Sequence, residues 1–160
     1  MIIYTDGSAK GNGKLDAVGG IGIFFDKNSL FNYGQKITFD TYNKQVTNNL
    51  TELLAIQKAI HISMSIGKTN NIIICTDSKY CYNIFTSWAS NWEKNKWSKK
   101  DGKPILNLDL IKDIHNLVKL YKIKFTHCNS HLNEPDNKNS NEHKIWYGNN
   151  QADYLANKYL

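Results

Sequence analysis

The chain has 160 residues, of which 41% are hydrophobic, and a formal net charge of +6. That length and apolar fraction fit one folded domain with a sizeable core and exclude a disordered chain. The 20 strongly basic residues are all lysines, so no bidentate guanidinium group is available for phosphate binding. The positive charge fits a polyanionic partner, but it fits a basic protein without such a partner equally well.

The cysteines, at positions 75, 81 and 128, are odd in number and contain no CxxC pair, which argues against a disulfide framework. No apolar stretch is long enough for a transmembrane helix, and the N-terminal residues lack the features of a signal peptide. We therefore expect an intracellular, cytoplasmic protein that does not bind membranes.

Short apolar segments predict three antiparallel strands at residues 1–5, 18–25 and 31–39, with a hairpin turn at residues 26–29. Apolar residues then recur with helical spacing up to Gly67, and Asn49 followed by Glu52 resembles a capping box at the start of this helix.

The second half of the chain alternates between strands and helices. An uninterrupted apolar run at residues 71–76 predicts a strand that is covered on both faces. The pattern then predicts helical segments at 78–95 and 108–120, a strand at 122–128, a polar loop at 133–141 and a last helix at 149–159. A meander followed by strand–helix crossovers indicates an α/β fold, with a mixed sheet and helices on its faces in a single domain.

Acidic residues stand at the ends of two predicted strands. Asp6 and Asp77 each follow a strand, and if these strands are parallel neighbours their carboxylates meet at the sheet edge where α/β proteins bind ligands. Glu52 lies in the first turn of the intervening helix and can lean over the same edge. Helix capping is the alternative role for Asp6 and Asp77, and Asp153 in the last helix would favour the helix dipole.

Carboxylates held this close repel one another and raise each other's pKa. Divalent cations bound between them would relieve this repulsion, and oxygen ligands suit Mg²⁺. The positions of these acidic residues therefore predict a metal site.

Four segments of the chain resemble the signature segments of type 1 ribonuclease H, in the same order and with compatible intervals: Tyr4–Ser8, Thr47–Glu52, Thr76–Tyr80 and Gly148–Asp153. The resemblance implies the ribonuclease H-like fold, with a five-stranded sheet in the order 3-2-1-4-5, strand 2 antiparallel, and helices on both faces. It also implies endonucleolytic cleavage of the RNA strand of RNA–DNA hybrids, giving 5′-phosphate and 3′-hydroxyl ends.

The same resemblance implies that Asp6, Glu52, Asp77 and Asp153 are catalytic and bind two Mg²⁺ ions, with Mn²⁺ as a possible substitute. Asp6 would bridge both ions, Asp153 would complete one site, and Glu52 with Asp77 would complete the other. The two ions would stabilise the attacking and the leaving oxygen of an in-line displacement.

Members of the family carry a mobile histidine between the fifth strand and the last helix, for which this chain offers two candidates. His131, on the loop, matches the family position and is expected to shuttle protons and aid product release. His127 falls within the predicted strand and is expected to be a packed histidine. The alternative is a zinc site at His127, Cys128 and His131, for which a fourth ligand is not evident.

The lysine segment, residues 88–104, contains five lysines against two acidic residues. It resembles the basic protrusion with which some family members grip the DNA strand. The resemblance implies that Trp92 packs against a deoxyribose beside Trp88, and that the lysines contact phosphates without reading sequence: Lys94, Lys96, Lys99, Lys100 and Lys103. The alternative is that Trp88 pins the helix to the core while the lysines are merely solvated.

Other positions match family contacts to the two strands. Contacts to the RNA 2′-hydroxyls are implied for these residues: Gly7, Ser8, Asn12, Asn48 and Asn49. Turn stabilisation and helix capping are the alternative roles for the asparagines. Thr47 and Asn107 match a DNA phosphate pocket whose third member is often arginine, a residue that this chain lacks and that Lys44 could replace.

Residues 136–146 form an insertion relative to compact bacterial members, which we interpret as a surface loop. We expect a monomer of one catalytic domain over residues 1–160, without an additional N-terminal hybrid-binding domain. Two alternatives to the nuclease remain: an inactive hybrid-binding module, and a ribonuclease H-like nuclease with another nucleic-acid substrate.

Overall fold

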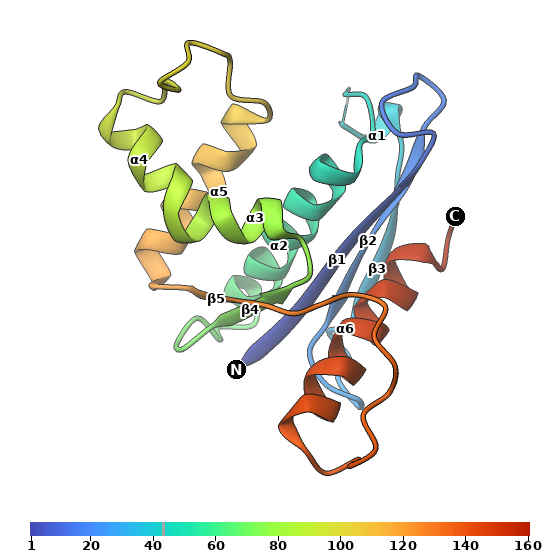
Figure 1. The fold of residues 1–160 in the computed structure, drawn as a ribbon. Coiled ribbons are helices and arrows are strands. Elements are labelled where there is room, and N and C mark those ends of the chain that lie inside the picture. The colour runs from blue at the N-terminus through green and yellow to red at the C-terminus, as the bar shows by residue number, and fades with distance from the viewer. Residues whose placement is uncertain (43) are drawn as a thin grey trace.

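The computed structural model describes residues 1–42 and 44–160. Five strands form one mixed sheet in the order β3-β2-β1-β4-β5 (Figure 1). They are β1 (Ile2–Lys10), β2 (Val18–Phe24), β3 (Tyr33–Ile37), β4 (Ile73–Thr76) and β5 (Lys124–His127). The strand β2 runs antiparallel to β1 and β3, whereas β1, β4 and β5 are parallel to one another. The strand order and directions implied by the resemblance are therefore confirmed.

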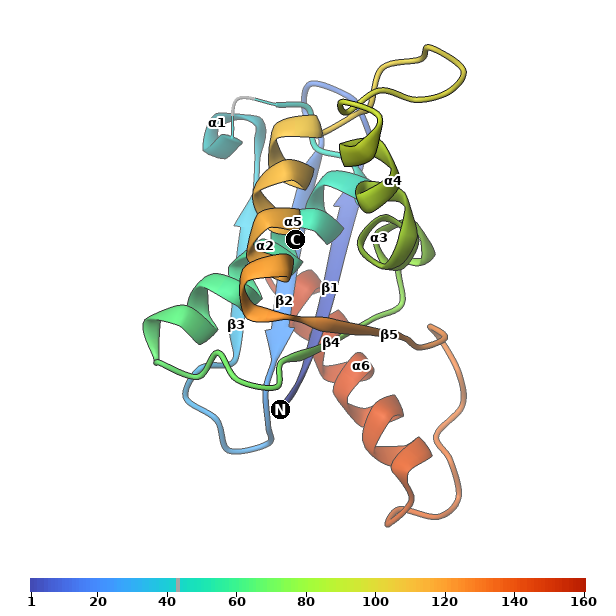
Figure 2. The same cartoon turned by 90° about the vertical axis from the view of Figure 1, so that its left-hand side faces the viewer.

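Helices cover both faces of this sheet, as predicted. They are α1 (Phe39–Tyr42), α2 (Asn48–Ser65), α3 (Lys79–Asn83), the π-helical turn η1 (Ile84–Trp88), α4 (Ala89–Lys94), α5 (Leu108–Tyr121) and α6 (Asn141–Asn157). Figures 1 and 2 show α2 and α5 on one face, with α3 and α4 beside them, and α6 alone on the other face. The short α1 was not predicted, since its four residues carry too little periodicity.

The main core lies between the sheet and α2, and a smaller one lies under α6. Every residue of α2 from Leu50 to Ile56 is buried, so this helix runs through the core instead of lying on its surface. On the opposite face, Gly20 and Gly22 of β2 let α6 approach closely, because a Cβ at either position would collide with the backbone of Ala156 or Ala152. The two helices are thereby fixed on opposite sides of β1.

Two predicted boundaries were wrong in ways that matter for function. Asp6 does not end the first strand, because β1 continues to Lys10 through its pairing with β2. The last helix begins at Asn141 and not at residue 149, because the hydroxyl of Ser140 accepts the backbone N–H of His143 at 3.1 Å and caps it. The region interpreted as a surface loop therefore supplies the first turns of α6.

The three cysteines are buried free thiols. In the described part of the chain, no helix has both the length and the hydropathy that crossing a membrane requires.

Candidate metal and nucleic-acid site

The register of two parallel strands brings Asp6 and Asp77 together. The ladder between β1 and β4 ends at the pair Thr5 and Thr76, so the next residue of each strand is an aspartate. Asp77 leaves the sheet at the carboxyl end of β4, as predicted, whereas Asp6 continues in β1 opposite Gly22. Two carboxylates are thus fixed side by side by backbone hydrogen bonds.

Glu52 reaches the same place from α2, because Gly7 allows that helix to lie directly against β1. A Cβ at Gly7 would collide with the backbone at Thr51 and Glu52. The helix starts at Thr47, whose hydroxyl accepts the backbone N–H of Leu50 at 3.1 Å, so the predicted capping by Asn49 was wrong. Glu52 therefore lies two residues further into the helix than expected, and it is only 8% exposed.

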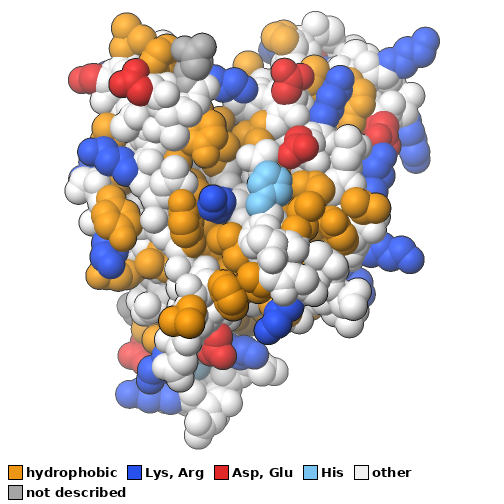
Figure 3. Space-filling view, turned by 180° about the vertical axis from the view of Figure 1, so that it is seen from behind, with side chains coloured by type: hydrophobic (Ala, Val, Ile, Leu, Met, Phe, Trp, Pro, Cys, Tyr) orange, Lys and Arg blue, Asp and Glu red, His pale blue; other side chains and the backbone are white. Residues whose placement is uncertain are grey.

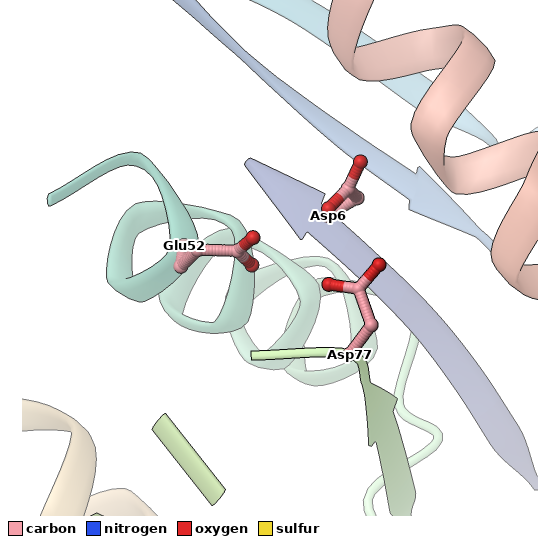
Figure 4. A group of neighbouring side chains, drawn as sticks. All are labelled: Asp6, Glu52 and Asp77. Carbon is pink, nitrogen blue, oxygen red and sulfur yellow. The ribbon is translucent and has the colours of Figure 1, made fainter. Parts of the chain in front are cut away.

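These three residues form an acidic triad. Figure 4 shows the carboxylates of Asp6, Glu52 and Asp77 converging from a strand, a helix and a strand end. One oxygen of each lies within 4.8 Å of the others. Burial, reinforced by the charges of Glu52 and Asp77, raises the pKa of Asp6 far above its usual range. Burial and the charge of Asp77 likewise raise the pKa of Glu52 to about 8.

The acidic triad fits a hard divalent cation. Its ligand atoms are all carboxylate oxygens, the type that Mg²⁺ and Mn²⁺ prefer. The Oε2 atom of Glu52 is buried and lacks a hydrogen-bond partner among the described residues, a costly state that a cation would relieve. The site can therefore hold a metal, which would take the place of the protons that the raised pKa values retain on Asp6 and Glu52.

Asp153 lies outside the acidic triad but interacts with it. Its carboxyl group lies close enough to Asp6 to raise the pKa of that residue further. It lies in the C-terminal third of α6, not in the first turn as predicted, so it does not interact favourably with the helix dipole. One turn earlier, the buried Asn149 donates its amide to Asp77 at 3.4 Å. Asn149 belongs to the segment Gly148–Asp153, but no role was predicted for it. Its spacing of four from Asp153 places both residues on one helix face.

A cavity of about 300 Å³ opens beside these carboxylates, between α6 and the His loop, residues 128–140. Asp77, His131 and Asp153 line it together, so the structure places His131 beside two of the four acidic residues. His127 was expected to be a packed histidine, but it is exposed. Its Nε2 atom lies 3.2 Å from the carbonyl oxygen of Asp77. In the described residues, the only compact group of three potential metal ligands is the acidic triad, which leaves the zinc alternative without support.

The lysine segment forms a surface protrusion on α4 and the following loop (Figure 1). Trp88 is 38% exposed, whereas Trp92 is half-buried and packs against the main core, so the core role proposed for Trp88 belongs to Trp92. The two rings lie 6.0 Å apart, and the ammonium group of Lys99 lies 5.9 Å from the Trp92 ring centroid. The remaining lysines of the segment are exposed.

Several predicted substrate residues also hold the fold together. The side chain of Asn12 accepts the backbone N–H of Asn48 at 2.7 Å, which ties the loop after β1 to the start of α2. The hydroxyl of Ser8 donates to the carbonyl of Ala156 at 3.1 Å, toward α6. Asn107 precedes α5 in a left-handed conformation. Asn48 and Asn49 are exposed in the first turn of α2 and remain free to bind a ligand with their side chains.

Lysine side chains are not confined to the protrusion. On the face seen from behind, they are dispersed among apolar and neutral groups (Figure 3). The protrusion is therefore distinguished by its combination of lysines with tryptophan rings, more than by charge alone.

Comparison with known proteins gives a consistent result. The family model described as RNase H matches residues 1–160. A probable ribonuclease H from Acanthamoeba polyphaga mimivirus is 35% identical over 93% of this chain and 61% of its own length. A ribonuclease H from Clostridium botulinum strain Hall is 31% identical over 99% of this chain and 93% of its own length. The chain thus spans less than two thirds of the viral relative but nearly all of the bacterial one.

The fold has solved counterparts. The structure of LC11-RNase H1 in complex with an RNA/DNA hybrid matches with a TM-score of 0.60 at 20% identity, covering 98% of this chain and 94% of that one. At this identity the similarity concerns the fold.

Proposed function

Because the chain belongs to the RNase H family, we propose that it hydrolyses the RNA strand of RNA–DNA hybrids with the help of two divalent metal ions, giving 5′-phosphate and 3′-hydroxyl ends. The single observation that carries the proposal is the acidic triad, in which three carboxylates are held together at a cost in free energy that a bound cation would offset. We propose Mg²⁺ as the ion and residues 1–160 as the catalytic unit.

The acidic triad and Asp153 would hold the metal. Asp6, which interacts with the other three carboxylates, is the residue suited to bridge two ions, with Asp153 on one side and Glu52 with Asp77 on the other. Bound there, two divalent ions would stabilise the negative charge on the attacking and leaving oxygens. Asn149 would keep the carboxylate of Asp77 in one orientation through its amide hydrogen bond.

Residues around the metal site would bind the two strands differently. His131, beside Asp77 and Asp153, would move a proton near the cleaved bond. The exposed amides of Asn48 and Asn49 can both donate to and accept from RNA 2′-hydroxyls. The lysine segment would bind phosphates of the DNA strand, and Trp88 and Trp92 would offer flat surfaces to its sugars. This division of labour would restrict cleavage to the RNA strand of a hybrid.

The test uses RNA–DNA, RNA–RNA and DNA–DNA duplexes of one sequence, each with one labelled strand. We expect Mg²⁺-dependent cutting of the RNA in the hybrid alone, and loss of that cutting in Asp77→Asn. Asp109→Asn is the matched control, because Asp109 is an exposed aspartate at the start of α5. Equal cutting of double-stranded RNA would indicate another substrate. Binding of the hybrid without cutting would indicate an inactive binding module.

A further inference from the structure

The His loop is fastened to α6 by two side chains that the proposed chemistry does not use. The indole N–H of Trp146 donates to the carbonyl oxygen of Leu132 at 2.9 Å. The Nε2 atom of His143 lies 2.8 Å from a carboxylate oxygen of Glu134. Trp146 and His143 are three residues apart in the first turns of α6, so both contacts come from one face of the helix.

These attachments reach back to the core of the protein. The ring of His143 is stacked on Tyr147 at 6.5 Å, and Tyr147 packs edge-on against Phe24 of β2 at 5.7 Å. Phe24 is buried with Ala152 under α6. Neighbouring aromatic rings therefore connect the part of α6 that contacts the His loop to the sheet.

One attachment lies directly beside the proposed proton carrier. Leu132, whose carbonyl is held by Trp146, follows His131, and the backbone of His131 has a left-handed φ of 55°. Because Trp146 fixes the carbonyl of Leu132 and the backbone of His131 has this rare conformation, the side chain of His131 can point in fewer directions. The side chain of His131 lines the cavity that contains Asp77 and Asp153.

We propose that Trp146 and His143 are positioning residues, which hold the His loop so that His131 faces Asp77 and Asp153. The inference rests on the proposed hydrolysis for its catalytic part only, since restraint of the loop is a property of the protein without substrate. It gives residues 136–146, which the sequence suggested were a bland surface loop, a role in placing His131.

The test combines Trp146→Phe with His131→Ala. Phenylalanine keeps the ring packing of Trp146 but cannot donate a hydrogen bond. Loss of one such bond is expected to lower kcat by about three- to tenfold with KM nearly unchanged. In the His131→Ala background, Trp146→Phe should have no further effect, because Trp146 acts through His131. Tyr154→Phe is the control, since Tyr154 is exposed on the same helix.

Amide hydrogen exchange of the His loop supplies a readout that does not depend on activity. Exchange at residues 129–135 should become faster in Trp146→Phe and, to a smaller extent, in Glu134→Ala, where the changed residue is exposed and cannot disturb the core. Unchanged exchange, unchanged kcat in Trp146→Phe, or an equal loss of kcat with and without His131 would overturn the proposal. If the wild-type protein does not cut hybrids, the proposed function fails, and the exchange measurement still decides whether the loop is restrained.

Discussion

The acidic triad holds its ionisable groups largely buried, whereas the lysine segment exposes its charged groups to water. Asp6 and Glu52 are buried, and their positions are fixed by a strand ladder and by a helix that touches β1 at Gly7. The lysines lie at the surface on α4 and the loop that follows, and only Lys99 is half-buried. Water screens the charges of the lysines, whereas the carboxylates lose most of their solvation.

Under the proposed function, this difference assigns the chemistry to the acidic triad and the binding affinity to the lysine segment. Buried carboxylates that repel one another destabilise the fold unless a ligand compensates them, so their presence points to a specific function. Exposed lysines destabilise the fold little, and each adds a small, salt-dependent contribution to phosphate binding. Substitutions in the triad should therefore change rate and stability sharply, while substitutions in the lysine segment should change affinity gradually.

The largest effect is expected from Asp6→Asn. Removing the carboxylate that interacts with all the others should lower the rate of hybrid cleavage by roughly 10³-fold, a typical loss for a central electrostatic group. The metal-free variant should nevertheless melt at a higher temperature than the wild type, because one repelling charge is gone. Thermal melting in a chelating buffer and single-turnover cleavage in Mg²⁺ check the two parts. A variant that is both inactive and less stable would contradict the account.

The stability of the metal-free protein should fall as pH rises. Burial and repulsion raise the pKa of Glu52 from its ordinary value of 4.5 to about 8 in the folded state, so the fold favours the protonated form. That stabilisation is complete below pH 4.5 and is lost as pH rises through about 8. Because a tenfold change in proton affinity corresponds to about 1.4 kcal/mol, the loss should reach a few kcal/mol.

Denaturant unfolding at several pH values measures this loss, and Glu52→Gln is the control that should flatten the profile. Saturating Mg²⁺ should also restore stability at pH 8, since it binds only the charged form of the site. A metal-free protein that becomes more stable between pH 5 and 8 would contradict the proposed arrangement of charges.

Removing the support of Asp77 should have an intermediate effect. Asn149→Ala deletes the amide that donates to Asp77, and the loss of such a partner typically reduces metal affinity or activity by about 10- to 100-fold. A higher Mg²⁺ concentration should recover part of the rate. The neighbouring Asn150→Ala is a suitable comparison, because Asn150 is exposed. Equal rates for the two variants would rule out a positioning role for Asn149.

The smallest change per residue is expected in the lysine segment. Replacing Lys99, Lys100 and Lys103 by alanine should weaken hybrid binding by about tenfold at low salt and reduce the slope of log K against log salt by up to about three. The cleavage rate at saturating substrate should stay within about twofold. An unchanged salt slope would show that the segment does not contact phosphates.

The acidic site at the sheet edge could be predicted from the sequence, because acidic residues stand at the predicted ends of two strands. Asp77 follows the short apolar strand β4, and Asp6 and Asp77 were expected to meet if β1 and β4 are parallel neighbours, an arrangement that the resemblance implied and the structure has. The extension of β1 beyond Asp6 was missed, since Gly7 and Ser8 read as a turn. That mistake did not affect the site, because register and not strand length sets the position of Asp6.

The region after β5 was harder to predict because its sequence is polar and asparagine-rich. The signal that was available is Ser140 followed by Glu142, a cap and a first-turn acid, but the apolar periodicity that usually confirms a helix is weak there. Contacts between distant segments, such as Trp146 with Leu132 and Asn149 with Asp77, leave no local pattern in the sequence. They follow from the packing of α6 on the sheet.

The most direct test of the central claim measures cleavage of a hybrid with labelled RNA after the protein has been stripped with a chelator. The account predicts no cleavage in the chelator, full recovery when Mg²⁺ is added back, and no recovery in Asp6→Asn at any Mg²⁺ concentration. Undiminished cutting of the RNA strand in the chelator, or normal recovery in Asp6→Asn, would contradict the claim that the acidic triad is the metal site of this protein.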